Sequence, residues 1–279
     1  MIIALYHKIF KFSSSYMSEN VRFFAENVLI LNDFRIDVLS NVWYFTMDKA
    51  SESDLKMRMR KKPNLQPRME KCAAVQIAEP AALRGKWRES FPGKSLWLEI
   101  GCGKGQFTVG TAKENPEAEL IALERVEDAM VIAMERACAE ETDNVRFISM
   151  DALKLREVFA PGEVERVFVN FCDPWPKSRD AKHRLTSPNF LRIYADILPM
   201  GGEVCFKTDN LPLFTWSLEQ IKAEGWEVHS VTNDLHAGGE GGVMTDYECK
   251  FREMGVKINR LVAELVSKTG NRYQLVNLV

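Results

Sequence analysis

Short apolar runs alternate with amphipathic segments from about residue 95 to residue 266. The runs have the length of buried strands, and they lie at residues 96–100, 119–124, 145–150, 164–171, 202–207, 226–231 and 259–266. Apolar residues at helical spacing predict helices at residues 106–115, 127–141, 188–198 and 212–225, with a short helix after the glycine-rich stretch 238–242. This alternation predicts an α/β fold, a doubly wound and mostly parallel sheet with helices on both faces.

The first 56 residues do not share this pattern. They are rich in Phe, Asn and Ser, and the composition turns strongly basic at Met57. We expect Met57 to be the natural start and residues 1–56 to come from an upstream start codon. A genuine extension packed on the domain is the alternative. The expected organisation is an extension at 1–56, a basic leader at 57–94, the α/β domain at 95–267 and a tail at 268–279.

Composition narrows the class of protein. The 279 residues are 46% hydrophobic and 27% charged, with a net charge of −2, so a nucleic-acid site must be a local patch. None of the six cysteines forms a Cys-x-x-Cys pair, which indicates neither a zinc site nor a disulfide framework. The apolar runs fall far short of the roughly 20 residues that a membrane span needs. We therefore expect a cytoplasmic protein without a metal or a membrane anchor.

A glycine-rich turn, Gly-Cys-Gly-Lys-Gly at residues 101–105, follows the first strand. Gly101, Gly103 and Gly105 let the backbone turn tightly and approach a ligand. Their spacing differs from the dinucleotide fingerprint, because residue 106 is Gln. Glu99 precedes the turn, and its carboxylate would repel a pyrophosphate but attract the sulfonium and ammonium of S-adenosyl-L-methionine. The turn therefore predicts this cofactor and a methyltransferase.

Acidic residues end the next two strands. Glu124 is placed to accept both ribose hydroxyls, and Asp151 to accept from the adenine amino group. Each acid taken alone fits a solvated loop residue better than a ligand contact. Together with Glu99 and the glycine turn they favour the cofactor site.

The fourth strand runs into Asn-Phe-Cys-Asp-Pro-Trp-Pro-Lys at residues 170–177. The prolines stiffen the loop, and Trp175 offers a surface on which a purine can stack. Asp173 lies at the strand end nearest the transferred methyl group. The alternative is a proline-rich loop around a packed tryptophan.

Two basic runs flank this loop in the sequence. Residues 177–184 hold four Lys or Arg against one acid, and the leader adds six against Glu70. A charge run is usually a solvated face, but two such runs beside one loop favour a phosphate-binding patch for RNA.

Residues 245–248, Thr-Asp-Tyr-Glu, follow the stretch 238–242. They are placed to act as a lid carrying base contacts. They also form a good capping box, Thr245 with Glu248. The two roles are compatible.

Taken together, these motifs resemble a known family. Glu-x-Gly-x-Gly-x-Gly-Gln-Phe, Asn-Phe-x-Asp-Pro-Trp-Pro-Lys, Phe-Lys-Thr-Asp-Asn and Met-Thr-Asp-Tyr-Glu resemble the bacterial tRNA (guanine-N7)-methyltransferases from about Met57 to Leu265. The resemblance implies a Rossmann-like methyltransferase fold with an antiparallel last strand. It also implies methyl transfer to N7 of a guanosine in the variable loop of tRNA.

The resemblance carries roles to individual residues. It implies cofactor contacts at Glu99, Glu124, Asp151 and Asp173, with Asp173 also catalytic. It implies substrate contacts at Lys177, Asp209, Thr245, Asp246, Tyr247 and Glu248, and RNA contacts at Arg179, Lys182, His183 and Arg184. His183 departs from the family's usual Arg or Lys, and residues 1–56 have no counterpart.

The chemistry suits these residue types. Guanine N7 carries a free lone pair, so its attack on the methyl group needs alignment rather than a general base. The alternatives are a methyltransferase for a small molecule or protein, a nicotinamide-dependent dehydrogenase, and a non-catalytic RNA-binding module. The basic run speaks against the first, while Gln106 and Glu99 speak against the second. A monomer and a homodimer are both compatible with the sequence.

Overall fold

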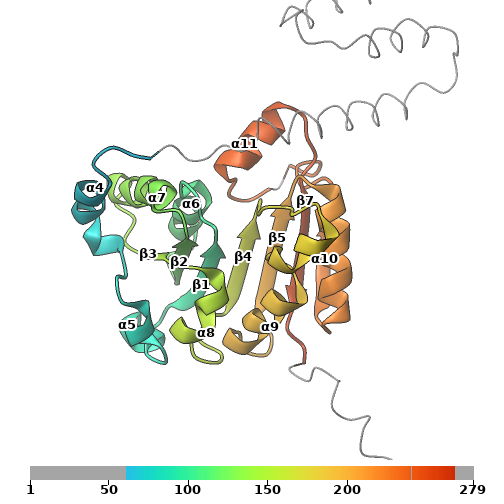
Figure 1. The fold of residues 1–279 in the computed structure, drawn as a ribbon, viewed down its shortest axis with the longest axis horizontal. Helices are drawn as coiled ribbons and strands as arrows, with labels where there is room; N and C mark the ends of the chain where they lie inside the picture. Colours follow the sequence, from blue (N-terminus) through green and yellow to red (C-terminus); the bar gives the residue numbers. More distant parts are fainter. Residues whose placement is uncertain (1–60, 240, 268–279) are drawn as a thin grey trace, which may run out of the picture. The chain divides into compact units, whose positions relative to one another are not determined.

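Seven strands form one sheet in the order β3-β2-β1-β4-β5-β7-β6 (Figure 1). The computed structural model describes residues 61–239 and 241–267, so the predicted 1–56 extension, the start at Met57 and the 268–279 tail lie outside the described residues. Only β7 runs antiparallel, paired with both β5 and β6. The predicted fold class is therefore confirmed. The strands are β1 (Ser95–Ile100), β2 (Ala118–Glu124), β3 (Val145–Ser149), β4 (Arg166–Asn170), β5 (Glu203–Thr208), β6 (Glu227–Thr232) and β7 (Asn259–Glu264).

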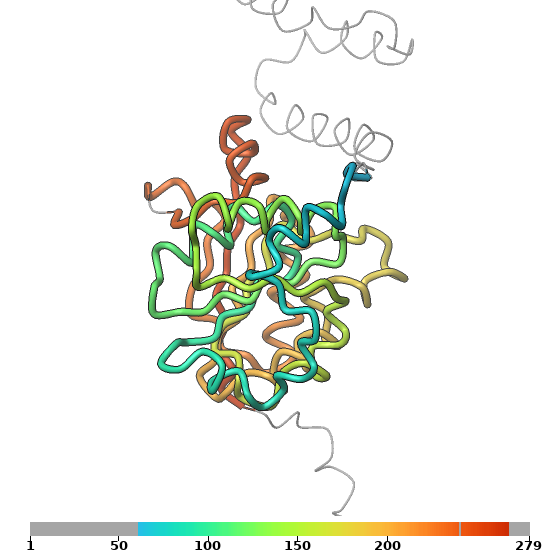
Figure 2. The backbone as a smooth tube through the Cα atoms, turned by 90° about the vertical axis from the view of Figure 1, so that its left-hand side faces the viewer, coloured from blue at the N-terminus to red at the C-terminus, as the bar shows by residue number. Residues whose placement is uncertain are grey.

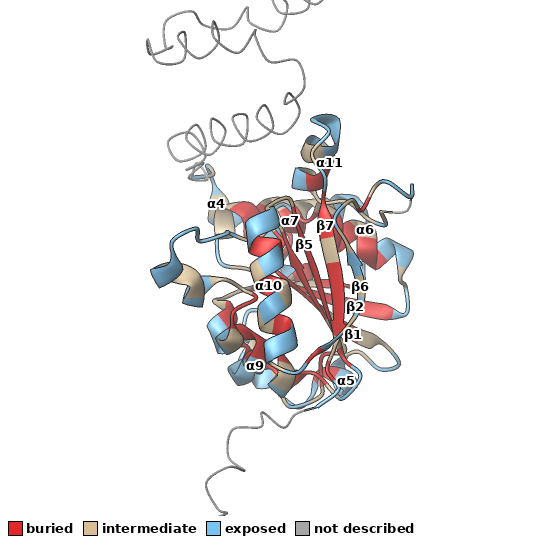
Figure 3. Ribbon diagram, turned by 90° about the vertical axis from the view of Figure 1, so that its right-hand side faces the viewer, coloured by how far each residue is buried: buried red, intermediate tan, exposed pale blue. Residues whose placement is uncertain are grey.

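Helices cover the two faces of the sheet (Figure 3). On one face α6 (Gln106–Glu114) and α7 (Glu127–Ala139) pack on β1, β2 and β3, with α4 (Leu65–Lys71) against α7. On the other face lie α5 (Trp87–Ser90), α8 (Leu155–Val158), α9 (Pro188–Ile197) and α10 (Leu211–Ala223). Side chains of a strand alternate between these faces, so Leu98 joins the core under α9 while its neighbour Glu99 faces α6.

The remaining elements are short. They are the 3₁₀ turns η2 (Ala73–Val75), η3 (Pro80–Leu83), η4 (Ala152–Lys154) and η5 (Ser178–His183), and the helix α11 (Asp246–Glu253). Figure 1 shows α11 above the carboxyl ends of β4 and β5, and in Figure 2 the same segment, coloured orange-red, projects from the top of the fold. The turn η5 lies in the basic run 177–184. The hydrophobic pattern predicts no element there, because these six residues contain no periodic apolar positions.

Predicted boundaries agree to within a few residues. The helix expected at 127–141 ends at Ala139, and the strand expected at 259–266 ends at Glu264. Asp151 belongs to the turn after β3, where its Oδ1 accepts a hydrogen bond from Leu153 N at 2.9 Å. This local hydrogen bond favours a turn at Asp151, so β3 ends before it, at Ser149.

Candidate functional site

A cleft of about 590 Å³ opens at the carboxyl ends of β1 to β4. It lies where the strand order reverses, because β1 and β4 are adjacent although β2 and β3 separate them in sequence. Open α/β sheets bind their ligands at this point. The lining includes apolar side chains and a smaller set of polar ones, among them Ile100, Leu123, Glu124, Met150, Asp151, Leu153, Asn170, Asp173, Trp175, Lys182, His183 and Phe190.

The three glycines of the turn have different surroundings. Gly101 lines the cleft, at φ +79°, and a Cβ there would meet nothing within 4 Å. Gly103 donates its N–H to Glu124 Oε2 at 3.0 Å. Gly105, at φ +78°, faces helix α7, where an added Cβ would lie 2.6 Å from the Cβ of Ala133. Gly101 therefore shapes the cleft, whereas Gly105 lets α6 approach α7.

Two of the predicted cofactor acids line the cleft. Glu124 accepts hydrogen bonds from Gly103 N and from Val126 N, at 3.0 and 2.9 Å. Asp151 accepts one bond, from Leu153 N. A carboxylate has about four acceptor sites, so both side chains keep capacity for hydroxyl or amino donors of a ligand.

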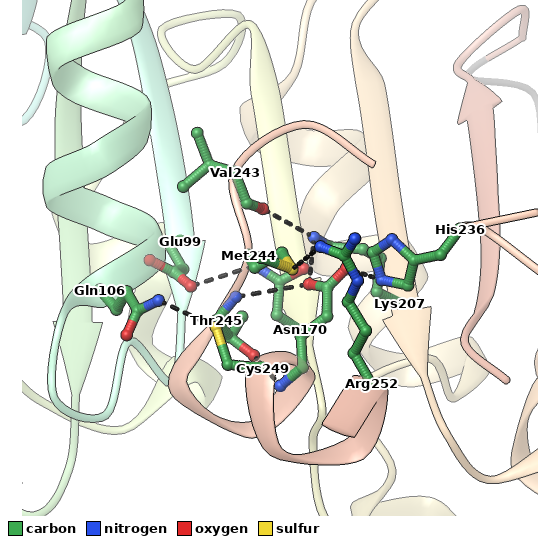
Figure 4. Close-up of polar contacts among 11 residues, drawn as sticks. Glu99, Gln106, Asn170, Lys207, His236, Val243, Met244, Thr245, Cys249 and Arg252 are labelled. Carbon is green, nitrogen blue, oxygen red and sulfur yellow. Dashed lines mark hydrogen bonds and ion pairs between the residues drawn. The ribbon is translucent and has the colours of Figure 1, made fainter. Parts of the chain in front are cut away.

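Glu99 lies behind the wall of the cleft rather than in it. Its side chain is buried, and its two oxygens accept hydrogen bonds from the Thr108 hydroxyl and from Asn170 Nδ2, the latter at 3.1 Å (Figure 4). Burial raises the pKa of Glu99, and those two hydrogen bonds and the charge of Lys207 oppose the rise. The carboxylate therefore fixes the orientation of the Asn170 side chain.

Asn170 is a cleft residue to which the sequence reasoning assigned no role. Its side chain is 7% exposed, and since Glu99 takes the Nδ2 donor, its Oδ1 faces away and has no hydrogen-bond partner. A buried acceptor without a partner is costly and points to a missing donor. In the sequence, the feature that could have identified Asn170 is a polar residue at the last position of a buried strand.

The loop after β4 is held in an unusual shape. Phe171 and Trp175 have φ values of +50° and +44°, a region that costs side-chain-bearing residues energy and is frequent at functional sites. Arg184 stabilises this shape: its guanidinium donates to the carbonyls of Pro174 and Trp175, each at 2.9 Å. Asp173, in the same loop, is exposed and lines the cleft.

The basic run after this loop divides into two groups. Lys177, Arg179, Lys182 and His183 are exposed, and the last two line the cleft. Arg184 is partly buried, with its guanidinium 4.3 Å from the ring centroid of Trp216. The run therefore presents its first four basic side chains to solvent and uses the fifth to hold the loop.

The predicted substrate residues after β5 also divide. Asp209 is partly buried beside β5, and burial raises its pKa. Thr245 and Glu248 form the predicted capping box, which is confirmed. Asp246 pairs with Arg136 of α7 at 3.3 Å, and Tyr247 is 52% exposed.

The sequence model of a family described as "Putative methyltransferase" matches residues 93–261. The tRNA (guanine-N(7)-)-methyltransferase of Listeria innocua is 42% identical over 210 residues, which cover 75% of this chain and 98% of that protein. The chain belongs to the tRNA (guanine-N(7)-)-methyltransferase family.

Other members of the family are equally similar. The proteins of Halalkalibacterium halodurans and Lachnoclostridium phytofermentans are 43% and 44% identical, and the matches cover 96% and 89% of their lengths. Among solved structures, the 16S rRNA methyltransferase KamB has a TM-score of 0.50 at 17% identity, covering 67% of this chain and 93% of its own. This likeness supports the fold. Within residues 61–239 and 241–267, no helix is long and apolar enough to cross a membrane, and no cluster of metal-ligating side chains occurs.

Proposed function

We propose that this protein transfers a methyl group from S-adenosyl-L-methionine to N7 of a guanosine in the variable loop of tRNA. The observation that carries the proposal is the 42% identity to a tRNA (guanine-N(7)-)-methyltransferase over 98% of that enzyme's length. The cleft at the switch point supplies the matching chemistry. An enzyme acting on tRNA is expected in the cytoplasm, as a monomer or a homodimer.

The cleft fits the cofactor. Glu124 would accept from the ribose hydroxyls and Asp151 from the adenine amino group, using their remaining lone pairs. The Oδ1 of Asn170 lacks a donor, and the ammonium of the methionine moiety is a donor of the right charge for an acceptor backed by Glu99. Gly101 would leave room for the cofactor, because apart from its own chain neighbours no atom lies within 4 Å of where its Cβ would be.

The loop after β4 would receive the guanine. When bound, the cofactor supplies an electrophilic methyl group on a sulfonium. The protein's part is to align N7, methyl and sulfur, and such alignment supplies at most about 7–11 kcal/mol. The base becomes cationic as it is methylated, and the carboxylate of Asp173, which lines the cleft, would accept from its N1–H and amino group. Asp209 is the second candidate for this role, although it does not line the cleft. Trp175 is 38% exposed and offers a stacking face.

The exposed basic side chains would bind the tRNA backbone. Lys177, Arg179, Lys182 and His183 are exposed on and beside η5, and Lys182 and His183 line the cleft. Tyr247 of α11 is exposed and would offer a base contact. Arg184 is expected to act through the loop that it holds rather than on a phosphate.

One assay tests the proposal. Unmodified tRNA is incubated with methyl-labelled S-adenosyl-L-methionine, digested to nucleosides, and analysed for the labelled product. Label in 7-methylguanosine is the expected result, and a tRNA with its variable-loop guanosine replaced by adenosine is the control. Label in another nucleoside, or tRNA binding without transfer, would contradict the assignment.

A further inference from the structure

The most deeply buried ion pair in the described part of the chain joins β5 to helix α11. Lys207 on β5 and Glu248 on α11 have side chains that are 7% and 0% exposed, and Lys207 Nζ lies 2.8 Å from Glu248 Oε2. Neither side chain lines the cleft. The pair is closed off from solvent in this structure, so its contacts are with the protein itself, although Glu248 Oε1 makes no hydrogen bond.

Further contacts connect this pair to the loop before α11. Lys207 Nζ donates to Val243 O at 3.1 Å and lies 4.9 Å from the ring centroid of Phe107. The imidazole of His236 places Nε2 3.1 Å from Glu248 Oε1. Figure 4 shows Lys207 and His236 beside the segment Val243–Met244–Thr245, with Glu99 and Asn170 on the neighbouring strand ends. One buried cation therefore links β5, α11 and the loop between β6 and α11.

Stability alone does not account for such an arrangement. The cost of removing two charges from water offsets most of their attraction, and well-packed apolar side chains in their place are often as stable or more so. What the pair adds is a defined position for α11, because the two charges tolerate no other arrangement in a dry interior. Arg136 and Asp246 make a second, more exposed pair that ties the start of α11 to α7.

The position of α11 matters for the site. Phe251 of α11 lies 5.9 Å, centroid to centroid, from Phe171, whose side chain belongs to the cleft wall. Tyr247 is four residues before Phe251, so both occupy one side of the helix. A displaced α11 would therefore move the exposed Tyr247 and leave Phe171, whose φ is +50°, without its stacking partner.

We propose that Lys207 is a positioning residue for the acceptor tRNA, which acts through Glu248 and His236 to hold α11 over the strand ends. The inference rests on the proposed function for the identity of the acceptor. It changes the role expected of Glu248, from a substrate contact to a partner of Lys207. Thr245 likewise serves the cap of α11, and Tyr247 remains the member of residues 245–248 that is free to meet RNA.

The test compares Lys207→Met, Glu248→Gln and the double variant. Lys207→Met leaves the buried Glu248 carboxylate without its lysine and with only His236 beside it, which should undock α11 and raise KM for tRNA by ~10-fold or more. The Kd for S-adenosyl-L-methionine, from calorimetry, should change by less than ~3-fold. Hydrogen exchange should accelerate in residues 245–253 and not in β5. Lys113→Met is the matched control, because it breaks a pair of the same length, 2.8 Å to Glu140, that is exposed.

The double variant separates positioning from substrate contact. Lys207→Met/Glu248→Gln removes both charges, so α11 should dock again and KM for tRNA should return to within ~3-fold of the wild type. If the Glu248 carboxylate binds the base directly, the double variant will be as impaired as Glu248→Gln, and the proposal is overturned. An unchanged KM and unchanged exchange in folded Lys207→Met overturn it as well.

The design covers two possible failures, a Lys207→Met variant that does not fold and a wild type that does not methylate tRNA. If Lys207→Met does not fold, recovery in the double variant relative to Glu248→Gln still decides the question. If the wild type fails to methylate tRNA, the proposed function fails. Exchange in residues 245–253 and cofactor affinity still show whether Lys207 holds α11.

Discussion

Replacing Gly105 with alanine tests how the glycine turn is built. Gly105 has φ +78°, and a non-glycine residue in that left-handed region costs roughly 1–2 kcal/mol. Its Cβ would lie 2.6 Å from Ala133 Cβ and 2.9 Å from Ala133 Cα, so helix α7 must shift. Overpacking of this kind costs about 1–3 kcal/mol. Gly105→Ala should therefore lower the free energy of unfolding by about 2–5 kcal/mol, measured by urea titration.

Gly101→Ala is the matched control. Gly101 has nearly the same φ, +79°, but nothing lies within 4 Å of its added Cβ, so only the backbone cost of about 1–2 kcal/mol applies. That methyl group enters the cleft, and calorimetry should show weaker binding of S-adenosyl-L-methionine than in Gly105→Ala at a temperature where both are folded. Equal loss of stability in the two variants would refute the packing role of Gly105. Unchanged cofactor affinity in Gly101→Ala would refute the role of Gly101 in the cleft.

Four further outcomes are expected. Because burial raises the pKa of Glu99 above its usual 4.5, the stability of the wild type relative to Glu99→Gln should be greatest below pH 4.5. It should fall as the pH rises through the folded pKa, and urea titrations at several pH values that show the opposite slope would contradict this. Asp173→Asn should keep its urea midpoint, since Asp173 is exposed, yet lose ~100-fold or more in kcat. Arg179→Gln should reduce the slope of log KM for tRNA against log salt by ~0.9, and an unchanged slope would remove Arg179 from the phosphate contacts. Burial raises the pKa of the Cys172 thiol to about 12, so it should react with a disulfide reagent far more slowly than exposed Cys138, as cysteine-specific mass mapping can show.

Much of the site could be predicted because it lies at strand ends. An apolar run followed by an acid or a glycine marks both the strand and the residue that emerges at its carboxyl edge. Glu124, Asp151, Asp173 and Gly101 all reach the cleft for this reason. The prediction holds without knowing the packing, because parallel strands bring all their carboxyl ends to the same edge.

The prediction was weaker where a side chain has a choice of partners. Glu99 and Glu248 are the same residue type as Glu124, which lines the cleft. Their side chains are instead buried, where they accept hydrogen bonds from Asn170 and Lys207 respectively. Arg184 reads as one more cation of the run at 177–184, yet its guanidinium holds loop carbonyls. Periodicity does not encode these pairings, because they join residues from distant parts of the chain.

The sequence by itself determined the doubly wound sheet, the cofactor turn and the family, since these follow from local period, local backbone demands and contiguous motifs. The tertiary structure alone decided which polar residues face a ligand and which hold the frame. Glu99 takes the amide donor of Asn170 and so leaves its Oδ1 without a partner, and Lys207 meets Glu248 only because α11 packs beside the end of β5. Both roles depend on burial and on a partner at hydrogen-bond distance, and these exist only once the elements have packed.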